Sequence, residues 1–280
     1  MVKILVDSTQ DLTPELLKKL DVEVVPLYVN FGDESFKDGI DITTKKLYEE
    51  VEKRKMLPKT AAVTVGDFIE VFTKYVNEGY EVVFTGISKE MSSTYSNAVV
   101  AAKEVNPEKI FIADSKNLST GIGLLVLKAC KDRDNGLSAK QIKENIEKNA
   151  SKVLSQFAIE RMDYLYKGGR CSSIALIAGT ILKIKPIIQV RGGKMSVQQK
   201  PIGKIERALD RMLDQIIKDK DRLDLDHILV THAEAQESRD YLLPKLKEHF
   251  PGVDIIVTEA GCVISSHCGK GTIGILYMVK

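Results

Sequence analysis

Short apolar runs alternate with helical patterns through the first half of the chain, and this alternation limits the folds open to it. Buried strands are predicted where β-branched and apolar residues dominate, at Lys3–Val6, Val22–Val29, Glu81–Ile87 and Lys109–Ala113. A strand and helix alternation of this kind favours a parallel sheet covered by helices on both faces. Ligands in such sheets bind at the carboxyl ends of the strands.

Three helix starts can be recognised between these strands. Thr13 stands before Pro14, a residue favoured in the first turn of a helix. Thr44 precedes a second helical pattern, and Ser138 has Gln141 three residues later, which is the spacing of a capping box. These signals predict that helices begin just after Thr13, Thr44 and Ser138.

The pattern changes after about residue 150. Val153–Ile159 predicts a strand, Lys167–Arg170 a basic glycine turn and Ser172–Leu182 a helix of small and apolar residues. Pro186–Gln199 predicts a β-hairpin, because the pair Gly192 and Gly193 suits a tight primed turn. Further helices and strands are then expected to alternate at Ile205–Ile217, His227–Thr231, Ser238–His249 and Val253–Thr258.

A chain of 280 residues exceeds the size at which one hydrophobic core usually keeps growing, so two domains are expected. We place a parallel-sheet α/β domain at residues 1–155 and an α+β domain at residues 156–280. The small-residue helix at Ser172–Leu182 permits either close helix packing or an apolar ligand between helix and sheet.

Composition excludes several classes of function. The 41 basic and 39 acidic residues give a net charge of +2, which is too balanced for a nucleic-acid surface. The apolar runs fall short of the roughly 20 residues that a membrane span needs, so no stable membrane insertion is expected. The first residues read as a strand and the four cysteines form no Cys-x-x-Cys pair, which favours a reduced cytoplasmic location without a metal site.

The most informative motif is Gly261–Gly274, expected to form a glycine-rich loop around His267. Serine hydroxyls, Lys270 and backbone N–H groups in this segment suit a negatively charged group. After Glu259 the chain has no Asp or Glu, so a catalytic triad would need a distant acid. Binding is therefore the first interpretation and catalysis the second, with a plain surface turn as the alternative.

A second candidate site is the hydroxyl-rich segment Thr85–Ala98, which leaves a strand and enters a helix. Its serines would lie at a helix N-terminus, where free N–H groups favour an anion. Ser92 or Ser93 could equally serve only to cap that helix.

Together these motifs resemble the DegV family of bacterial fatty-acid-binding proteins over essentially the whole chain. Met91–Tyr95 is similar to the family's Leu-Ser-Gly-Thr-Tyr motif, and the end of Met162–Arg170 to its Leu-x-Lys-Gly-Gly-Arg signature. Ile264–Thr272 resembles the C-terminal His-x-Gly-x-Gly-Thr motif. The first two strands also look alike, at Lys3–Thr9 and Val25–Val29.

The resemblance implies a carrier that is not an enzyme and that holds one long-chain fatty acid. The acyl chain would lie inside the second domain and the carboxylate at the domain interface. Thr60 and Ser92 would hold the carboxylate, with His267 and Arg170 in the surrounding network. No catalytic residue, metal or further cofactor is implied. A separate fatty acid kinase would phosphorylate the carboxylate and supply acyl phosphate to phospholipid synthesis.

The chain departs from the family pattern at two places. Ala61, Ala62 and Val63 follow Thr60 where the family has Ser-Gln-Pro, which implies altered head-group recognition. Ile202 stands where the family commonly has an arginine associated with the kinase, which weakens the expectation of kinase coupling.

An enzyme is the alternative reading, for example a small hydrolase or phosphotransferase that uses Ser92 and His267. Against it, the chain has no Gly-x-Ser-x-Gly elbow. It also has neither a Walker A motif nor a Gly-x-Gly-x-x-Gly sequence, so nucleotide chemistry would come from a partner.

Overall fold

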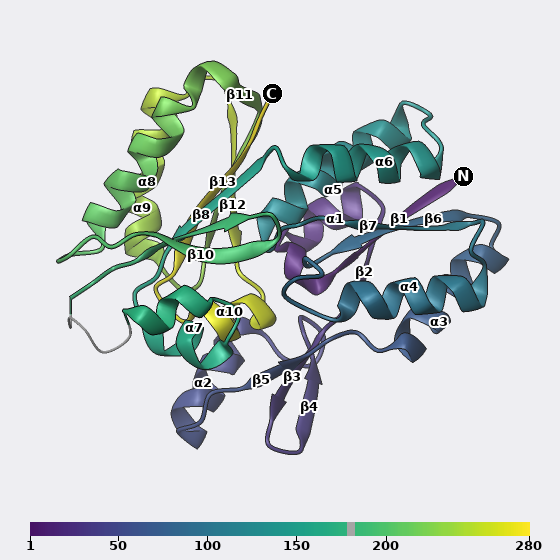
Figure 1. Cartoon of the computed structure of the whole chain (residues 1–280), viewed down its shortest axis with the longest axis horizontal. Helices are drawn as coiled ribbons and strands as arrows, with labels where there is room; N and C mark the ends of the chain where they lie inside the picture. Colours follow the sequence, from purple (N-terminus) through teal and green to yellow (C-terminus); the bar gives the residue numbers. More distant parts are fainter. Residues whose placement is uncertain (178–182) are drawn as a thin grey trace.

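Four parallel strands form the sheet of the first domain in the computed structural model, which describes residues 1–177 and 183–280 (Figure 1). The strand order is β2-β1-β6-β7, and every pair is parallel, as the alternating pattern predicts. Their bounds are β1 (Val2–Asp7), β2 (Val22–Val25), β6 (Glu81–Gly86) and β7 (Ile110–Asp114).

Helices cover both faces of this sheet because successive residues of each strand point to opposite sides. On one face, Leu5 and Phe84 pack in the same apolar cluster as residues of α3 and α4. On the other, Ile4 and Val83 pack with residues of the remaining helices. The five helices are α1 (Pro14–Lys19), α3 (Val65–Asn77), α4 (Thr94–Val105), α5 (Thr120–Asp134) and α6 (Ala139–Ala150).

The single strand expected at Val22–Val29 is wrong, because the chain forms two strands in different sheets. Pro26, which lacks an N–H group and cannot continue a strand ladder, separates them. After it, β3 (Tyr28–Phe31) joins a small antiparallel sheet of order β4-β3-β5. β4 is Glu34–Lys37, and β5 is Lys59–Ala61.

The helix starts follow the expected caps with one shift. Thr13 caps α1 and Ser138 forms the predicted capping box of α6. The N-cap of α2 (Thr44–Arg54) is Thr43 instead of Thr44, since the Thr43 side chain accepts the Lys46 N–H.

A mixed six-stranded sheet forms the second domain, in the order β10-β9-β8-β13-β11-β12. Only β11 and β12 pair in parallel. Helices α8 (Glu206–Lys218) and α9 (Gln236–His249) cover one face, and α7 (Met162–Gly168) lies on the other (Figure 1). The strands are β8 (Val153–Ala158), β9 (Ile187–Arg191), β10 (Lys194–Gln199), β11 (Leu223–His232), β12 (Asp254–Glu259) and β13 (Ile273–Val279).

Two expectations in the second domain are wrong. The Gly261–Gly274 segment is no loop: it contains the helix α10 (Cys262–Cys268) and runs into β13. The helix expected at Ser172–Leu182 begins as a short 3-10 helix, Ser172–Leu176, whose poorer hydrogen-bond geometry rarely extends beyond a few residues. The rest of that expected helix, residues 178–182, lies outside the described residues.

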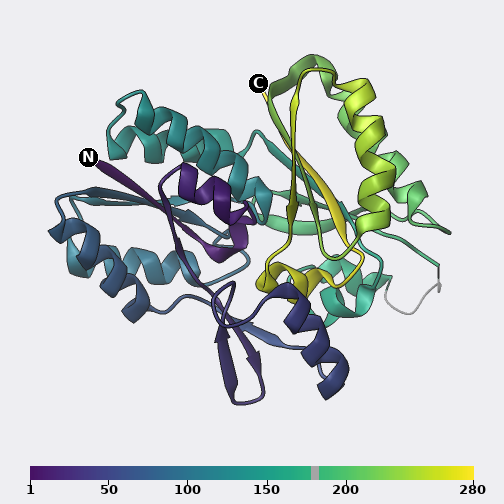
Figure 2. The same cartoon turned by 180° about the vertical axis from the view of Figure 1, so that it is seen from behind.

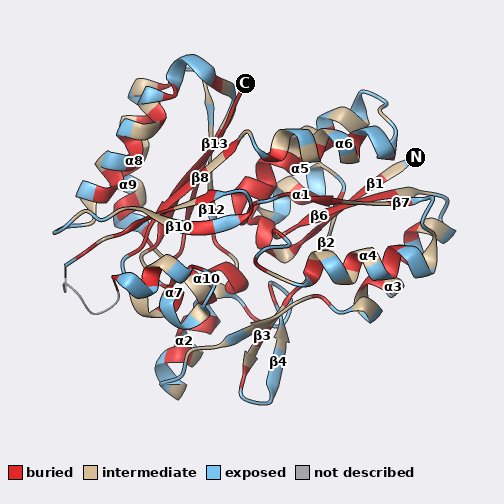
Figure 3. Ribbon diagram, in the orientation of Figure 1, coloured by how far each residue is buried: buried red, intermediate tan, exposed pale blue. Residues whose placement is uncertain are grey.

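The two domains share one hydrophobic core, to which α5 contributes. Leu276 and Met278 of β13 belong to the same buried cluster as Ile122 and Leu125 of α5. Figure 3 shows the buried strands of both sheets inside a shell of partly exposed helices. β8 spans residue 155 and belongs to the second sheet, and the domain boundary at that residue stays a prediction.

Among the described residues, no helix combines the length and the apolar character that crossing a bilayer needs.

Candidate functional site

Thr60, Ser92, Arg170 and His267 lie around one cavity of about 270 Å³ between the domains. They come from four separate segments: β5, the loop after β6, the turn after α7 and the end of α10. The position of Ser92 follows the rule that ligands bind beyond the carboxyl ends of parallel strands. The other lining residues are Leu27, Ala61, Ala62, Ile87, Met91, Ser93, Leu118, Met195, Val263, Ile264 and Cys268.

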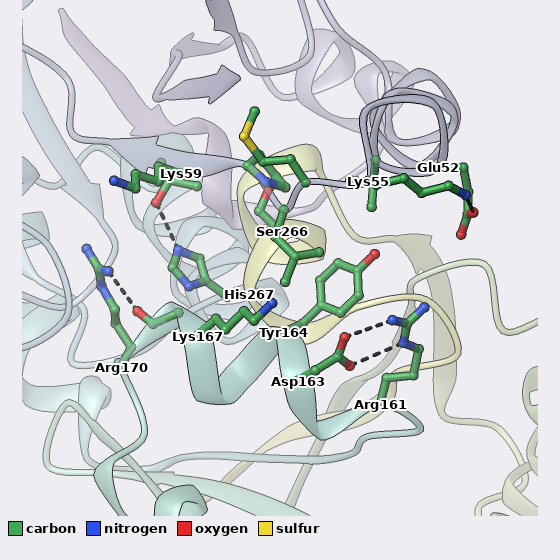
Figure 4. Close-up of a pocket in the computed structure, with 16 residues that line it drawn as sticks. Glu52, Lys55, Lys59, Arg161, Asp163, Tyr164, Lys167, Arg170, Ser266 and His267 are labelled. Atoms are coloured by element: carbon green, nitrogen blue, oxygen red, sulfur yellow. Dashed lines mark hydrogen bonds and ion pairs between the residues drawn. The ribbon is translucent and has the colours of Figure 1, made fainter. Parts of the chain in front are cut away.

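Thr60 and His267 are in direct contact across the domain interface. The Oγ1 atom of Thr60 lies 2.8 Å from Nε2 of His267 (Figure 4). Burial, and secondly the positive charge of Arg170, lowers the pKa of His267 from 6.5 to about 4. The imidazole is therefore neutral at pH 7 and can donate from only one ring nitrogen.

The second ring nitrogen of His267 faces the backbone of α7. Nδ1 is buried and has no hydrogen-bond partner among the residues that the structure describes. A Cβ atom added to Gly168 would lie 2.4 Å from Nδ1, so only glycine permits the ring to sit here. A buried acceptor without a partner is less costly than a buried donor, and this favours the tautomer with the proton on Nε2.

Ser92 caps the helix that follows it. Its Oγ atom accepts the Thr94 N–H at 3.2 Å and lies 3.0 Å from the Thr94 hydroxyl. Ser93 occupies the N-cap position of α4 without a side-chain cap bond. Capping and cavity lining are therefore both properties of Ser92, and the two readings of this segment do not exclude each other.

Arg170 joins segments of both domains at the mouth of the cavity. Its guanidinium donates to the carbonyl of Gly168 at 2.8 Å and to the carbonyl of Met91 at 3.5 Å. The side chain is exposed, so a positive charge remains beside the cavity where it attracts an anion.

Much of the cavity lining is apolar and comes from both domains. Met91, Leu118, Met195 and Ile264 line the cavity and belong to a buried cluster on the inner side of the second sheet. Ala61 and Ala62, which follow Thr60 in the chain, also line it, where the resemblance implied polar side chains. The cavity therefore offers both polar and apolar groups to a ligand.

A larger cleft of about 770 Å³ adjoins the cavity and shares Thr60, Arg170 and His267 with it (Figure 4). The Arg161 guanidinium forms two hydrogen bonds with Asp163 at 3.2 and 2.8 Å. Five basic side chains line the cleft against two acidic ones, so it carries an excess of positive charge. The charged residues are Lys55, Lys59, Arg161, Lys167, Arg170, Glu52 and Asp163.

The contacts of His267 differ from those of a catalytic triad. A triad needs a carboxylate on one ring nitrogen and the nucleophile on the other. Here Nε2 contacts Thr60, and Nδ1 has no partner within the described part of the chain. The described part of the chain also contains no group of three or more His, Cys, Asp or Glu side chains arranged to hold a metal ion.

Sequence reasoning missed Asp11 and Asp38, which hold the start of α10. The Asp11 carboxyl group accepts the Gly261 N–H at 2.9 Å, and Asp38 accepts the Cys262 N–H at 2.8 Å. Burial raises the pKa of Asp11 to about 8 and also raises that of Asp38. The sequence did contain a clue to Asp11, because this residue lies in the polar segment after β1, at the carboxyl end of a parallel strand.

The family model described as "Uncharacterised protein, DegV family" matches residues 1–280. The chain belongs to the DegV family. A DegV domain-containing protein from Clostridium acetobutylicum is 36% identical over 100% of this chain and 99% of its own length. Another from Clostridium perfringens is 32% identical over 99% and 98%. The family expected from the sequence motifs is thus confirmed.

Solved structures of DegV proteins share this fold. A fatty-acid-binding DegV protein from Thermus thermophilus has a TM-score of 0.92 at 26% identity, covering 100% of this chain and 99% of its own. A stearic acid-binding protein from Eubacterium ventriosum has a TM-score of 0.90 at 27% identity, with the same coverage. The two-domain architecture expected from the sequence is confirmed.

Proposed function

We propose that this protein is a carrier that binds one long-chain fatty acid. The observation that carries the proposal is the mixed lining of the cavity, in which Thr60, Ser92, Arg170 and His267 stand together with an apolar cluster. Burial of acyl methylenes contributes about 0.8 kcal/mol each, so the tail supplies most of the affinity. The solved relatives described as binding fatty acids support the same ligand class.

The carboxylate is proposed to accept hydrogen bonds from Thr60 and Ser92. With the proton on Nε2, His267 donates to Thr60 Oγ1 and leaves the Thr60 hydroxyl proton for the ligand. The Ser92 oxygen accepts the Thr94 N–H, and its own proton is available when the Thr94 hydroxyl also donates to it. Arg170 adds a positive charge at the mouth.

Native mass spectrometry of the purified protein, followed by lipid extraction, tests the ligand class. We expect one fatty acid per chain. Thr60→Ala and Ser92→Ala should each weaken binding by roughly 1.5–3 kcal/mol in a lipid-exchange assay, because each removes a hydrogen bond to a charged group. Ser96→Ala on the exposed side of α4 is the matched control. Wild-type affinity in the Thr60/Ser92 double variant would show that the head group binds elsewhere.

We further propose that the protein presents the carboxylate to a fatty acid kinase for acyl phosphate formation. The support is the basic cleft beside Thr60, Arg170 and His267, through which a partner could reach the head group. His267→Ala should still bind the lipid, at most about tenfold more weakly, and slow phosphoryl transfer by such a kinase, because the imidazole contacts the head-group site rather than the tail. Transfer at the wild-type rate would contradict this role.

A cytoplasmic location is proposed on the state of the cysteines. Cys130, Cys171, Cys262 and Cys268 are all buried free thiols, as expected in a reducing compartment. Fractionation of cells that express the tagged protein would test it, and recovery outside the cytoplasm would contradict it.

A further inference from the structure

The first domain holds the N-terminal end of α10, a helix that belongs to the second domain by sequence. Figures 1 and 2 show α10 beside α2 of the first domain. Asp38 accepts the N–H groups of Cys262 at 2.8 Å and Val263 at 3.3 Å, and Ser8 donates to the same carboxylate at 2.9 Å. Three donors therefore converge on two carboxylate oxygens.

Asp11 holds the residue immediately before the helix. Its carboxyl group accepts the Gly261 N–H at 2.9 Å and the Ser119 hydroxyl at 2.6 Å. A Cβ atom at Gly261 would lie 3.2 Å from Asp11 Oδ1 and 3.5 Å from both Asp38 oxygens. A glycine here lets both carboxyl groups approach the backbone.

These contacts connect directly to the walls of the cavity. α10 has only seven residues, and its other end carries His267. Val263, one of the residues held by Asp38, lines the cavity itself, as does Leu118 beside Ser119. A change at the start of so short a helix therefore moves the imidazole as well.

We infer that Asp38, assisted by Asp11, is a positioning residue that sets the place of His267 against Thr60. Neither aspartate lines the cavity, so both act through α10. The part of this inference that concerns ligand affinity rests on the proposed function, and the part that concerns the imidazole does not.

The test uses the full chain with isotope-labelled histidine and follows each imidazole by NMR as the pH changes. In Asp38→Asn, the amide nitrogen replaces one acceptor and faces an N–H donor. We expect His267 to leave its buried position and its pKa to rise from about 4 toward 6.5. Asp33→Asn, the same change on an exposed residue between β3 and β4, should leave His267 unchanged. His227, His232 and His249 serve as internal references.

The second readout is the dissociation constant for a long-chain fatty acid, expected to rise about tenfold in Asp38→Asn and not in Asp33→Asn. Gly261→Ala is a milder variant that presses a methyl group against the carboxyl groups of Asp11 and Asp38, and it should shift the His267 titration in the same direction. Lower melting temperatures with an unchanged His267 titration in both variants would overturn the inference. If the wild type binds no fatty acid, the proposed function fails while the NMR result still decides the positioning role.

Discussion

The backbone of Gly168 and the Nδ1 atom of His267 are in such close contact that a methyl group at residue 168 would lie 2.4 Å from that nitrogen. The two residues come from α7 and α10, which pack against each other on one side of the second sheet. The glycine of the basic turn therefore determines where the imidazole can lie, and the imidazole in turn contacts Thr60.

Gly168→Ala should displace the His267 ring and break its hydrogen bond to Thr60. We expect a stability loss of roughly 1–3 kcal/mol, typical of overpacking, together with weaker fatty-acid binding. Thermal unfolding and lipid exchange measure the two effects. Gly66→Ala in α3 is the control, because its Cβ would meet its nearest neighbour at 3.7 Å, an ordinary contact. Equal behaviour of the two variants would show that the ring is free to move.

The stability of the protein should depend on pH through His267. Its pKa is about 4 in the folded state and 6.5 as its ordinary value, so the unfolded state binds more protons between these pH values. The unfolding free energy should therefore fall as the pH drops from 6.5 to 4, by roughly 2–3 kcal/mol from this residue. His267→Gln should lack this component, which denaturant titrations at pH 7 and pH 4.5 would measure. Parallel losses in wild type and variant would contradict the assignment.

Met195 should influence which acyl chains the cavity accepts. Its side chain lines the cavity, so Met195→Phe should narrow the space and favour shorter chains. Met212 is buried in the separate cluster under α8, away from the cavity lining. Met212→Phe should therefore cost 1–3 kcal/mol of stability, the range usual for overpacked cores, and leave the chain-length profile unchanged. Competition binding with fatty acids of increasing length separates the two. An identical profile in wild type and Met195→Phe would place the tail elsewhere.

Local sequence patterns were sufficient to predict a strand or turn whose structure depends mainly on its own residues. The apolar runs at β1, β6 and β7 predicted a parallel sheet because buried strands need little else. The turn at Gly192 and Gly193 was equally local, since both glycines adopt the positive φ that a primed hairpin turn requires.

The helix α10 could not be recognised in the same way. It is short and rich in serine, cysteine and β-branched residues, which are weak helix formers. Its first N–H groups are satisfied by Asp11 and Asp38, more than 200 residues earlier in the chain. The binding role expected from the motif around His267 therefore stays a prediction, while its helical conformation depended on contacts that no local pattern contains.

The hydrophobic core that α5 shares with the second sheet limits which fragments of the chain can fold alone. Ile122 and Leu125 of α5 belong to one buried cluster with Leu229, Leu276 and Met278 from the other domain. A fragment that ended before β8 would expose this apolar side of α5 to water and so favour aggregation. Each domain thus lacks part of its hydrophobic core without the other. We therefore expect the whole chain to fold in one cooperative step, only after synthesis has reached β13.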